Sequence, residues 1–194
     1  MTASSMLSCR SPSPLAVLLA VFLGAACASP ARAEGIEVKQ AALVAAEEGH
    51  FLEAEFEIVL TPILEDALNK GVPLYFSLEF MLTRPRWYWF NKKLVNARQL
   101  YRLSYHVLTR QYRVGVGTTL YQNFASLTEA LAFLNRVRLR DIAEPGALAK
   151  GKSYVAEVRM RLDISQLPRP FQVSAVGSRD WSVSSDWYRW MVTP

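Results

Sequence analysis

The side chains best suited to molecular recognition gather in one short aromatic and basic segment. Its cations and rings are Arg84, Arg86, Trp87, Tyr88, Trp89, Phe90, Lys92 and Lys93. Cations interleaved with aromatic rings can stack on bases, dock on sugars or lie at the headgroup layer of a membrane. We expect this segment to bind a protein or a membrane surface. The alternative is that one set of these rings packs in the core, with the arginines stacked on the rings.

Residues typical of enzymes are sparse in this chain. Its two histidines, His50 and His106, lie too far apart in sequence for a metal pair on one helix. Its two cysteines, Cys9 and Cys27, fall in an N-terminal segment that we expect to be removed, so a thiol–imidazole pair is excluded. No Gly-x-Ser-x-Gly motif accompanies His106. We therefore expect no enzyme, no metal and no cofactor.

One set of carboxylates leaves an enzymatic hypothesis open. Glu53, Glu55 and Glu57 fall on one face of a predicted strand, at intervals of about 7 Å. Two carboxylates that flank one bond can hydrolyse a glycoside. The alternative is a solvated strand face, which is the more common role of such a pattern. A hydrolase that uses Glu55 or Glu57 is thus a third functional hypothesis.

Residues Met1 to Ala33 have the pattern of a secretory signal. Arg10 precedes an apolar run from Leu15 to Leu23, and Ala31-Arg32-Ala33 fits the small-residue rule for cleavage. The apolar run is shorter than the roughly 20 residues that a membrane-spanning helix requires. The sequence therefore predicts a signal peptide over residues 1–33.

The remaining residues, 34–194, are expected to form a single exported domain in the periplasm. Without cysteines, this domain has no disulfides and depends on a hydrophobic core for its stability. Two other processing routes stay open: cleavage at Ala26-Cys27-Ala28, and a lipoprotein site at Cys27.

Several segments alternate between apolar and polar residues, which is typical of half-buried strands. The clearest are residues 52–60, with glutamates on one face, and residues 72–82, with an apolar residue at every second position. A change of parity predicts a hairpin turn near Leu108 to Arg110. Gly115 and Gly117 lack the third glycine of a dinucleotide loop and are expected to mark a strand bulge. Further strands are predicted over residues 35–43, 155–164, 171–176 and 181–185.

Two short helices are predicted between these strands. Thr61 and Pro62 suit the cap and the first helical position, which predicts a helix over residues 62–70. Ser126-Leu127-Thr128-Glu129 has the spacing of a capping box, which predicts a second helix from Leu127 to Arg138. The helix would leave Arg136 and Arg138 in solvent, together with Arg140 beyond its end. Many strands without a β-α-β order favour a mainly β fold, an antiparallel β-sandwich with two short α-helices.

Charge is unevenly distributed along the chain. From Glu34 to Glu79 there are ten acids against two lysines, whereas from Phe80 to Arg140 there are eleven bases against one acid. We expect acidic and basic strands to lie side by side and to neutralise each other. The alternative is a basic surface that binds an anionic partner.

Four blocks of sequence resemble an exported proteobacterial family, domain of unknown function 4390. They are Arg86-Trp87-Tyr88-Trp89, the stretch Leu103 to Val114, the stretch Phe124 to Leu131, and the stretch Asp180 to Trp190. The resemblance covers essentially the whole expected mature chain. It implies an exported protein and supplies no catalytic residue; the family's genes often lie near one for a membrane sensor kinase.

These observations predict a non-enzymatic binding or accessory domain of the cell envelope. Its partner would be an envelope protein, a membrane sensor among them, or the membrane surface, and export argues against nucleic acid. The second hypothesis is a periplasmic carrier of a hydrophobic ligand, in which aromatic residues line a cleft between the sheets.

Overall fold

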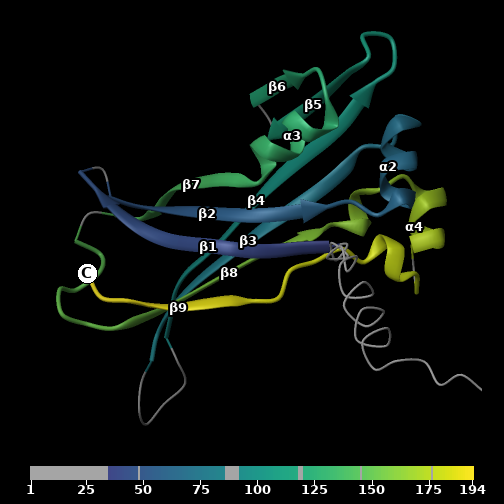
Figure 1. The fold of residues 1–194 in the computed structure, drawn as a ribbon. Coiled ribbons are helices and arrows are strands. Elements are labelled where there is room, and N and C mark those ends of the chain that lie inside the picture. The colour runs from purple at the N-terminus through teal and green to yellow at the C-terminus, as the bar shows by residue number, and fades with distance from the viewer. Residues whose placement is uncertain (1–34, 48, 86–91, 118–119, 145, 176) are drawn as a thin grey trace, which may run out of the picture. The chain divides into compact units, whose positions relative to one another are not determined.

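The described residues form two antiparallel sheets, which confirms the prediction of a mainly β chain (Figure 1). The computed structural model describes residues 35–47, 49–85, 92–117, 120–144, 146–175 and 177–194. The smaller sheet has the order β1-β2-β7, from Gly35–Ala46, Gly49–Val59 and Arg136–Ala143. The larger has the order β6-β5-β4-β3-β8-β9, from Leu120–Phe124, Gln111–Val116, Lys92–His106, Leu74–Arg84, Tyr154–Leu162 and Tyr188–Val192. The predicted signal peptide lies outside the described residues.

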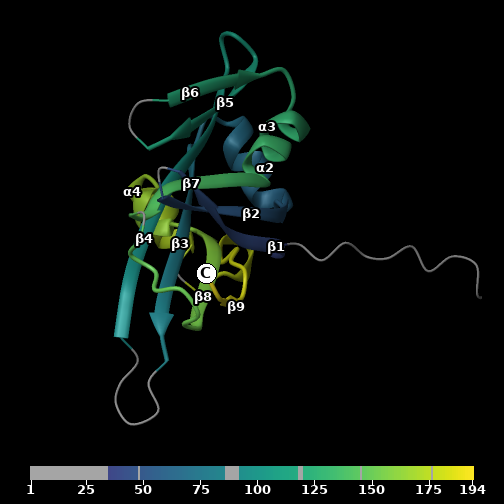
Figure 2. The ribbon, with the colours of Figure 1, turned by 90° about the vertical axis from the view of Figure 1, so that its left-hand side faces the viewer.

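The inner faces of both sheets contribute to one hydrophobic core. Along β3, apolar side chains at every second position, Phe76 to Leu82, are fully buried, as the alternation predicts. Along β2, Leu52, Phe56 and Ile58 face the same core. Figures 1 and 2 show β1 and β2 crossing the long strands β3 and β4. Burial of these side chains is what holds the fold, because the described residues contain no cysteine.

Helix α2 spans Pro62–Asn69 and confirms the first helix prediction. The Thr61 hydroxyl accepts a hydrogen bond from the Leu64 amide at 3.3 Å, so it caps the helix as expected. The same hydroxyl donates to the carbonyl of Asp180 at 2.9 Å. One side chain thus starts the helix and ties it to a segment 119 residues later.

Helix α3 begins at Leu127 as predicted but ends at Leu134, so the prediction of a helix to Arg138 was wrong. The capping box is present: Ser126 Oγ accepts from the Glu129 amide at 3.2 Å. Residues Arg136 to Ala143 form strand β7 instead, because Val137 and Ile142 are buried in the core while Arg136 and Arg138 meet glutamates of β2. Backbone pairing with β2 and the burial of Val137 and Ile142 outweighed the helical propensity of this segment.

Two predictions near the C-terminus were also wrong. The residues from Phe171 to Ala175, predicted as part of a strand to Val176, belong instead to helix α4, Arg169–Ala175, and Val176 lies outside the described residues. Pro170 stands in its first turn, where a missing amide costs nothing. Residues 179–181 form a 3₁₀ turn, η2 (Arg179–Trp181), and in the predicted strand 181–185 only Ser184 makes a bridge, to Arg161. The described residues therefore contain a third short α-helix beyond the two predicted.

The hairpin predicted near Leu108 to Arg110 is confirmed by the turn between β4 and β5. The bulge predicted at Gly115 and Gly117 is not observed, because the pairing of β5 with β4 and with β6 runs without a shift of register. Gly117 has a φ of +61° and lies beyond the end of β5.

Among the described residues, no helix is long and apolar enough to cross a membrane.

Candidate binding face

The described part of the predicted binding segment lies where β3 ends, at Arg84, and β4 begins, at Lys92. In the register of the two strands, the backbone of Arg84 lies opposite that of Lys92, and the backbone of Thr83 opposite that of Lys93. Arg84 is half-buried and Lys93 is exposed. The other predicted binding residues, Arg86, Trp87, Tyr88 and Trp89, lie outside the described residues.

The outer face of the six-stranded sheet carries a second set of cations, which we call the basic face. The strand registers place six arginines on it: Arg98, Arg102, Arg113, Arg159, Arg161 and Arg189. Three described carboxylates accompany them, Glu79, Glu157 and Asp163, and each contacts at least one arginine. Arginines therefore outnumber carboxylates by three on this face.

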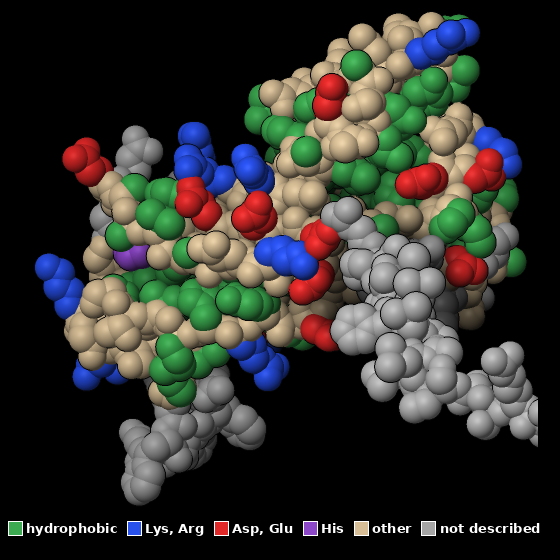
Figure 3. Space-filling view, in the orientation of Figure 1, with side chains coloured by type: hydrophobic (Ala, Val, Ile, Leu, Met, Phe, Trp, Pro, Cys, Tyr) green, Lys and Arg blue, Asp and Glu red, His purple; other side chains and the backbone are tan. Residues whose placement is uncertain are grey.

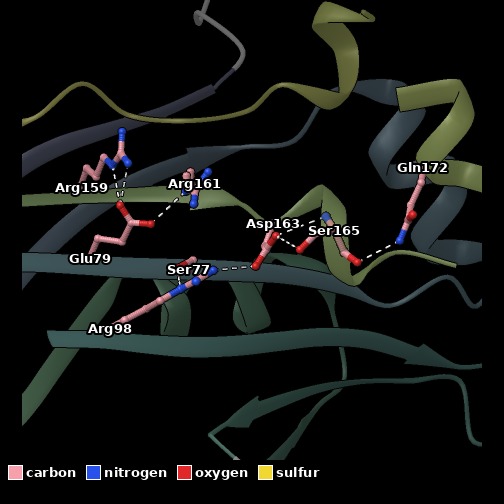
Figure 4. Close-up of polar contacts among 8 residues, drawn as sticks. All are labelled: Ser77, Glu79, Arg98, Arg159, Arg161, Asp163, Ser165 and Gln172. Atoms are coloured by element: carbon pink, nitrogen blue, oxygen red, sulfur yellow. Dashed lines mark hydrogen bonds and ion pairs between the residues drawn. The ribbon is translucent and has the colours of Figure 1, made fainter. Parts of the chain in front are cut away.

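On the basic face, Glu79 lies between Arg159 and Arg161 (Figure 4). Its Oε2 lies 2.7 Å from Nη2 of Arg159, and its Oε1 accepts a hydrogen bond from Nε of Arg161 at 3.0 Å. Burial raises the pKa of Glu79, but the hydrogen bonds and charges of the two arginines outweigh it, so the net pKa lies below its ordinary value of 4.5. This carboxylate is ionised at neutral pH and neutralises one of the two guanidinium charges.

A second polar chain ties the sheet to the C-terminal helices. Arg98 donates to Ser77 Oγ and to Asp163 Oδ2, both at 2.7 Å. Asp163 Oδ1 accepts a hydrogen bond at 2.6 Å from the hydroxyl of Ser165, in the turn η1 (Ile164–Gln166). Gln172 of α4 donates to the Ser165 carbonyl at 2.9 Å (Figure 4). These bonds hold Arg98 flat on the face and anchor α4 beside it.

Towards the edge strand β9, an arginine lies over an indole ring. Arg159 Cζ lies 4.4 Å from the centroid of the Trp187 ring, close enough for a cation–π interaction. Arg189 and Glu157 form a cross-strand ion pair beside it. Trp187 is therefore engaged with the basic face, whereas Trp181 is buried against Phe171.

At the opposite edge, the basic face is hollowed by a pocket of about 400 Å³. Its charged lining residues are Arg102 and Arg113, and the lining contains no carboxylate. His106 also lines it, with Nδ1 lying 3.1 Å from Thr109 Oγ1. The pocket is the concave part of a surface that is otherwise formed by flat strands.

The three-stranded sheet presents the glutamates considered for hydrolysis. Glu53 pairs with Arg138, and Glu55 lies 3.8 Å from Arg136 on β7. Glu57 lies 2.8 Å from Lys39 on β1. Figure 3 shows acidic and basic side chains next to one another along this sheet. The structure thus places an acidic strand beside a basic one here, as the charge distribution predicts.

A groove of about 490 Å³ follows these glutamates. Its lining includes Glu53, Glu55, Arg136 and Arg138, so acids and bases in it neutralise each other. Phe51 shares the parity of the glutamates and adds a ring to this face, 4.8 Å from Arg138 Cζ. No group of three or more metal-ligating side chains occurs in the part of the chain that the structure describes.

Sequence reasoning missed most of the basic face. The alternating arginines of β8, Arg159 and Arg161, were visible as one face of a predicted strand. The contacts with Glu79 and Asp163 were not, because they join residues 65 to 82 positions apart. Local patterns identify which residues share a face, whereas the pairing of strands decides which faces become one surface.

Fold and surface together define a mainly β domain with an arginine-rich sheet face. Residues 33–191 match the family described as Domain of unknown function (DUF4390). The chain belongs to this family, as the resemblance of its aromatic blocks indicated. No curated protein and no solved structure matches it.

Proposed function

We propose that this chain is a non-enzymatic binding domain, exported to the periplasm, that acts on an acidic surface of another envelope protein. The observation that carries the proposal is the excess of arginine on the basic face. Each carboxylate there already contacts an arginine, so the remaining positive charge is available to a partner. A membrane sensor is one such partner, in line with the gene context of the family.

The packing of the core also bears on this proposal. Large side chains such as Phe56, Phe76, Phe80 and Tyr154 are fully buried where the inner faces of the sheets meet. A carrier of a hydrophobic ligand needs an internal chamber, and a filled core favours a protein that binds at its surface. Native mass spectrometry of protein purified from the envelope tests the carrier hypothesis, which requires copurified lipid or peptide mass.

Paired variants test the basic face directly. Arg161→Gln with Arg189→Gln removes two arginines of the face, and Glu79 keeps Arg159 as its partner. Arg136→Gln with Arg138→Gln is the matched control, because these arginines also form cross-strand pairs with glutamates but lie on the other sheet. Cross-linking in intact cells followed by mass spectrometry should identify a partner that is lost in the first variant and kept in the control. Equal recovery by both variants would remove the basic face from the proposal.

The hairpin segment and the leader need their own experiments. Arg84→Gln with Lys93→Gln tests whether the end of the β3–β4 hairpin contributes to the same partner. N-terminal sequencing of the exported protein tests the leader, and we expect it to begin at Glu34. A chain that retains Met1 in the cytoplasm would contradict export.

A further inference from the structure

The pocket at the edge of the basic face brings two arginines together without a countercharge. It is lined by residues of β4, β5 and β6 and by the turn after α2, among them Gly71, Arg102, Ser104, His106, Arg113 and Tyr121. Arg113 Nε donates to Asn123 Oδ1 at 3.0 Å, which leaves its other guanidinium nitrogens for a further acceptor. Neither arginine forms an ion pair with a carboxylate among the described residues.

The register fixes the distance between the two arginines. Arg102 lies opposite Gly115, and Arg113 lies opposite Ser104, so the arginines are diagonal neighbours on β4 and β5. Diagonal neighbours in a sheet are about 7–8 Å apart, within reach of long side chains. Both guanidinium groups carry a positive charge and line the same pocket, so they repel each other, and an anion held between them would relieve the repulsion.

The Arg102 side chain has a hydrogen-bond donor without an acceptor among the described residues. Its guanidinium lies 5.8 Å from the centroid of the Tyr75 ring, directly across on β3. Its Nε is buried and has no hydrogen-bond partner among the described residues. Because a buried donor without a partner is costly, a bound acceptor at this atom would be favourable.

The absence of a side chain at Gly115 leaves room for the Tyr121 ring at the wall of the pocket. Gly115 stands between Arg102 on β4 and Tyr121 on β6 in the same row of the sheet. A Cβ atom at Gly115 would lie 2.8 Å from Cε1 of Tyr121, so the Tyr121 ring covers the glycine. Tyr121 is half-exposed and forms an aromatic wall beside the two guanidinium groups.

We propose that this pocket binds a phosphoryl group, with Arg102 and Arg113 as its charged contacts and Tyr121 against the rest of the ligand. Arginine suits this role, because its planar fork donates two parallel hydrogen bonds to phosphate oxygens. A free phosphate and the phosphate of a lipid headgroup present the same chemistry. This ligand site goes beyond the proposed partner binding, and it does not require Arg161 or Arg189.

Binding of two probes to the purified full chain tests the proposal. Inorganic phosphate is titrated by calorimetry, and vesicles of phosphatidylglycerol in phosphatidylcholine are tested by cosedimentation, with pure phosphatidylcholine vesicles as reference. Arg102→Gln and Arg113→Gln are each expected to weaken binding at least tenfold. Arg136→Gln, which removes the same charge from the other sheet, and the Arg161→Gln with Arg189→Gln variant should bind as the unmodified protein does.

The possible outcomes decide whether the pocket binds a phosphoryl group and which kind of ligand carries that group. Phosphate binding that is lost in the two pocket variants and kept in the controls supports a free phosphate ligand. The same pattern with phosphatidylglycerol vesicles alone supports a lipid headgroup. Equal weakening by Arg136→Gln, or binding of neither probe, would overturn the pocket. Arg113 is exposed, so Arg113→Gln decides the question if Arg102→Gln lowers the Tm.

Discussion

The carboxylate of Glu79 on β3 lies 2.7 Å from the guanidinium of Arg159 on β8. The Glu79 side chain is 16% exposed, and Arg161 holds its second oxygen. The single carboxylate of Glu79 on β3 thus contacts two arginines of the neighbouring strand β8. Since both arginines face outward, this contact organises the basic face and also joins β3 to β8.

Replacement of Glu79 should therefore cost stability. Glu79→Gln removes the charge and leaves two half-buried guanidinium groups facing an amide. We expect the free energy of unfolding to fall by about 2 kcal/mol, as for hydrogen bonds to charged groups. Urea unfolding measures the change. Glu55→Gln is the control, because Glu55 and Arg136 are 3.8 Å apart with side chains 52% and 84% exposed, and exposed pairs contribute little. Similar losses in both variants would contradict this assignment.

The contact of Glu79 with the two arginines also predicts how the free energy of unfolding depends on pH. The pKa of Glu79 lies below 4.5 in the folded chain, so its ionised form stabilises the fold above pH 4.5. This contribution is lost as the pH falls from 4.5 through the lower folded pKa. The difference in unfolding free energy between the unmodified chain and Glu79→Gln should accordingly be constant from pH 7 to about pH 5 and shrink below it. A difference that grows in acid would show that the pKa is raised instead.

The sequence predicts those elements whose determining residues lie close together along the chain. Phe76 to Leu82 alternate without interruption, and the cap at Thr61 lies next to its own helix, so β3 and α2 follow from the residues alone. Arg136 to Arg140 also alternate strictly, but the preceding capping box favoured continuing the helix through them. The deciding factor was the neighbouring β2, whose Glu53 and Glu55 pair with this segment.

The basic face is harder to predict from local sequence patterns. The predicted binding residues were chosen because cations and rings are adjacent in sequence, whereas the basic face is assembled from strands β3, β4, β5, β8 and β9. Arg98 and Asp163 are 65 positions apart, and nothing local marks them as partners. A glycine within a strand indicated a bulge at Gly115. Its actual neighbour, Tyr121, lies on the adjacent strand, and only the pairing of β5 with β6 reveals that contact.

A buried phenol on β4 predicts a second dependence on pH. Burial raises the pKa of Tyr101 from 10.0 to about 12, because the fold favours the neutral phenol. The stabilisation is present below pH 10 and is lost as the pH rises from 10 towards 12. Tyr101→Phe keeps the ring and removes the ionisable group, so its stability should decline less between pH 9 and pH 11. Tyr121→Phe, which alters a half-exposed phenol, serves as the control in the same alkaline unfolding series. An identical decline for Tyr101→Phe and the unmodified chain would refute the assignment.

The end of α3 offers the last test, because one residue there completes the hydrogen bonding of β2. The Asn135 carbonyl accepts from the Phe56 amide at 2.7 Å, and its Oδ1 accepts from the Ile58 amide at 3.2 Å. These amides lie beyond the point where β7 stops pairing with β2, at Glu55. Asn135 thus extends the edge of the sheet in place of a strand.

Asn135→Ala should lower the free energy of unfolding by about 1 kcal/mol, because the half-buried Ile58 amide loses its acceptor. Asn135→Asp retains a side-chain oxygen at this position and should cost less. Asn96→Ala, at an exposed position of β4, should change stability by no more than about 0.5 kcal/mol. Hydrogen exchange gives the specific readout: protection of the Ile58 amide should fall in Asn135→Ala and persist in Asn135→Asp. Unchanged protection in both variants would mean that water replaces the amide oxygen, and that the helix end holds β2 through its backbone carbonyl alone.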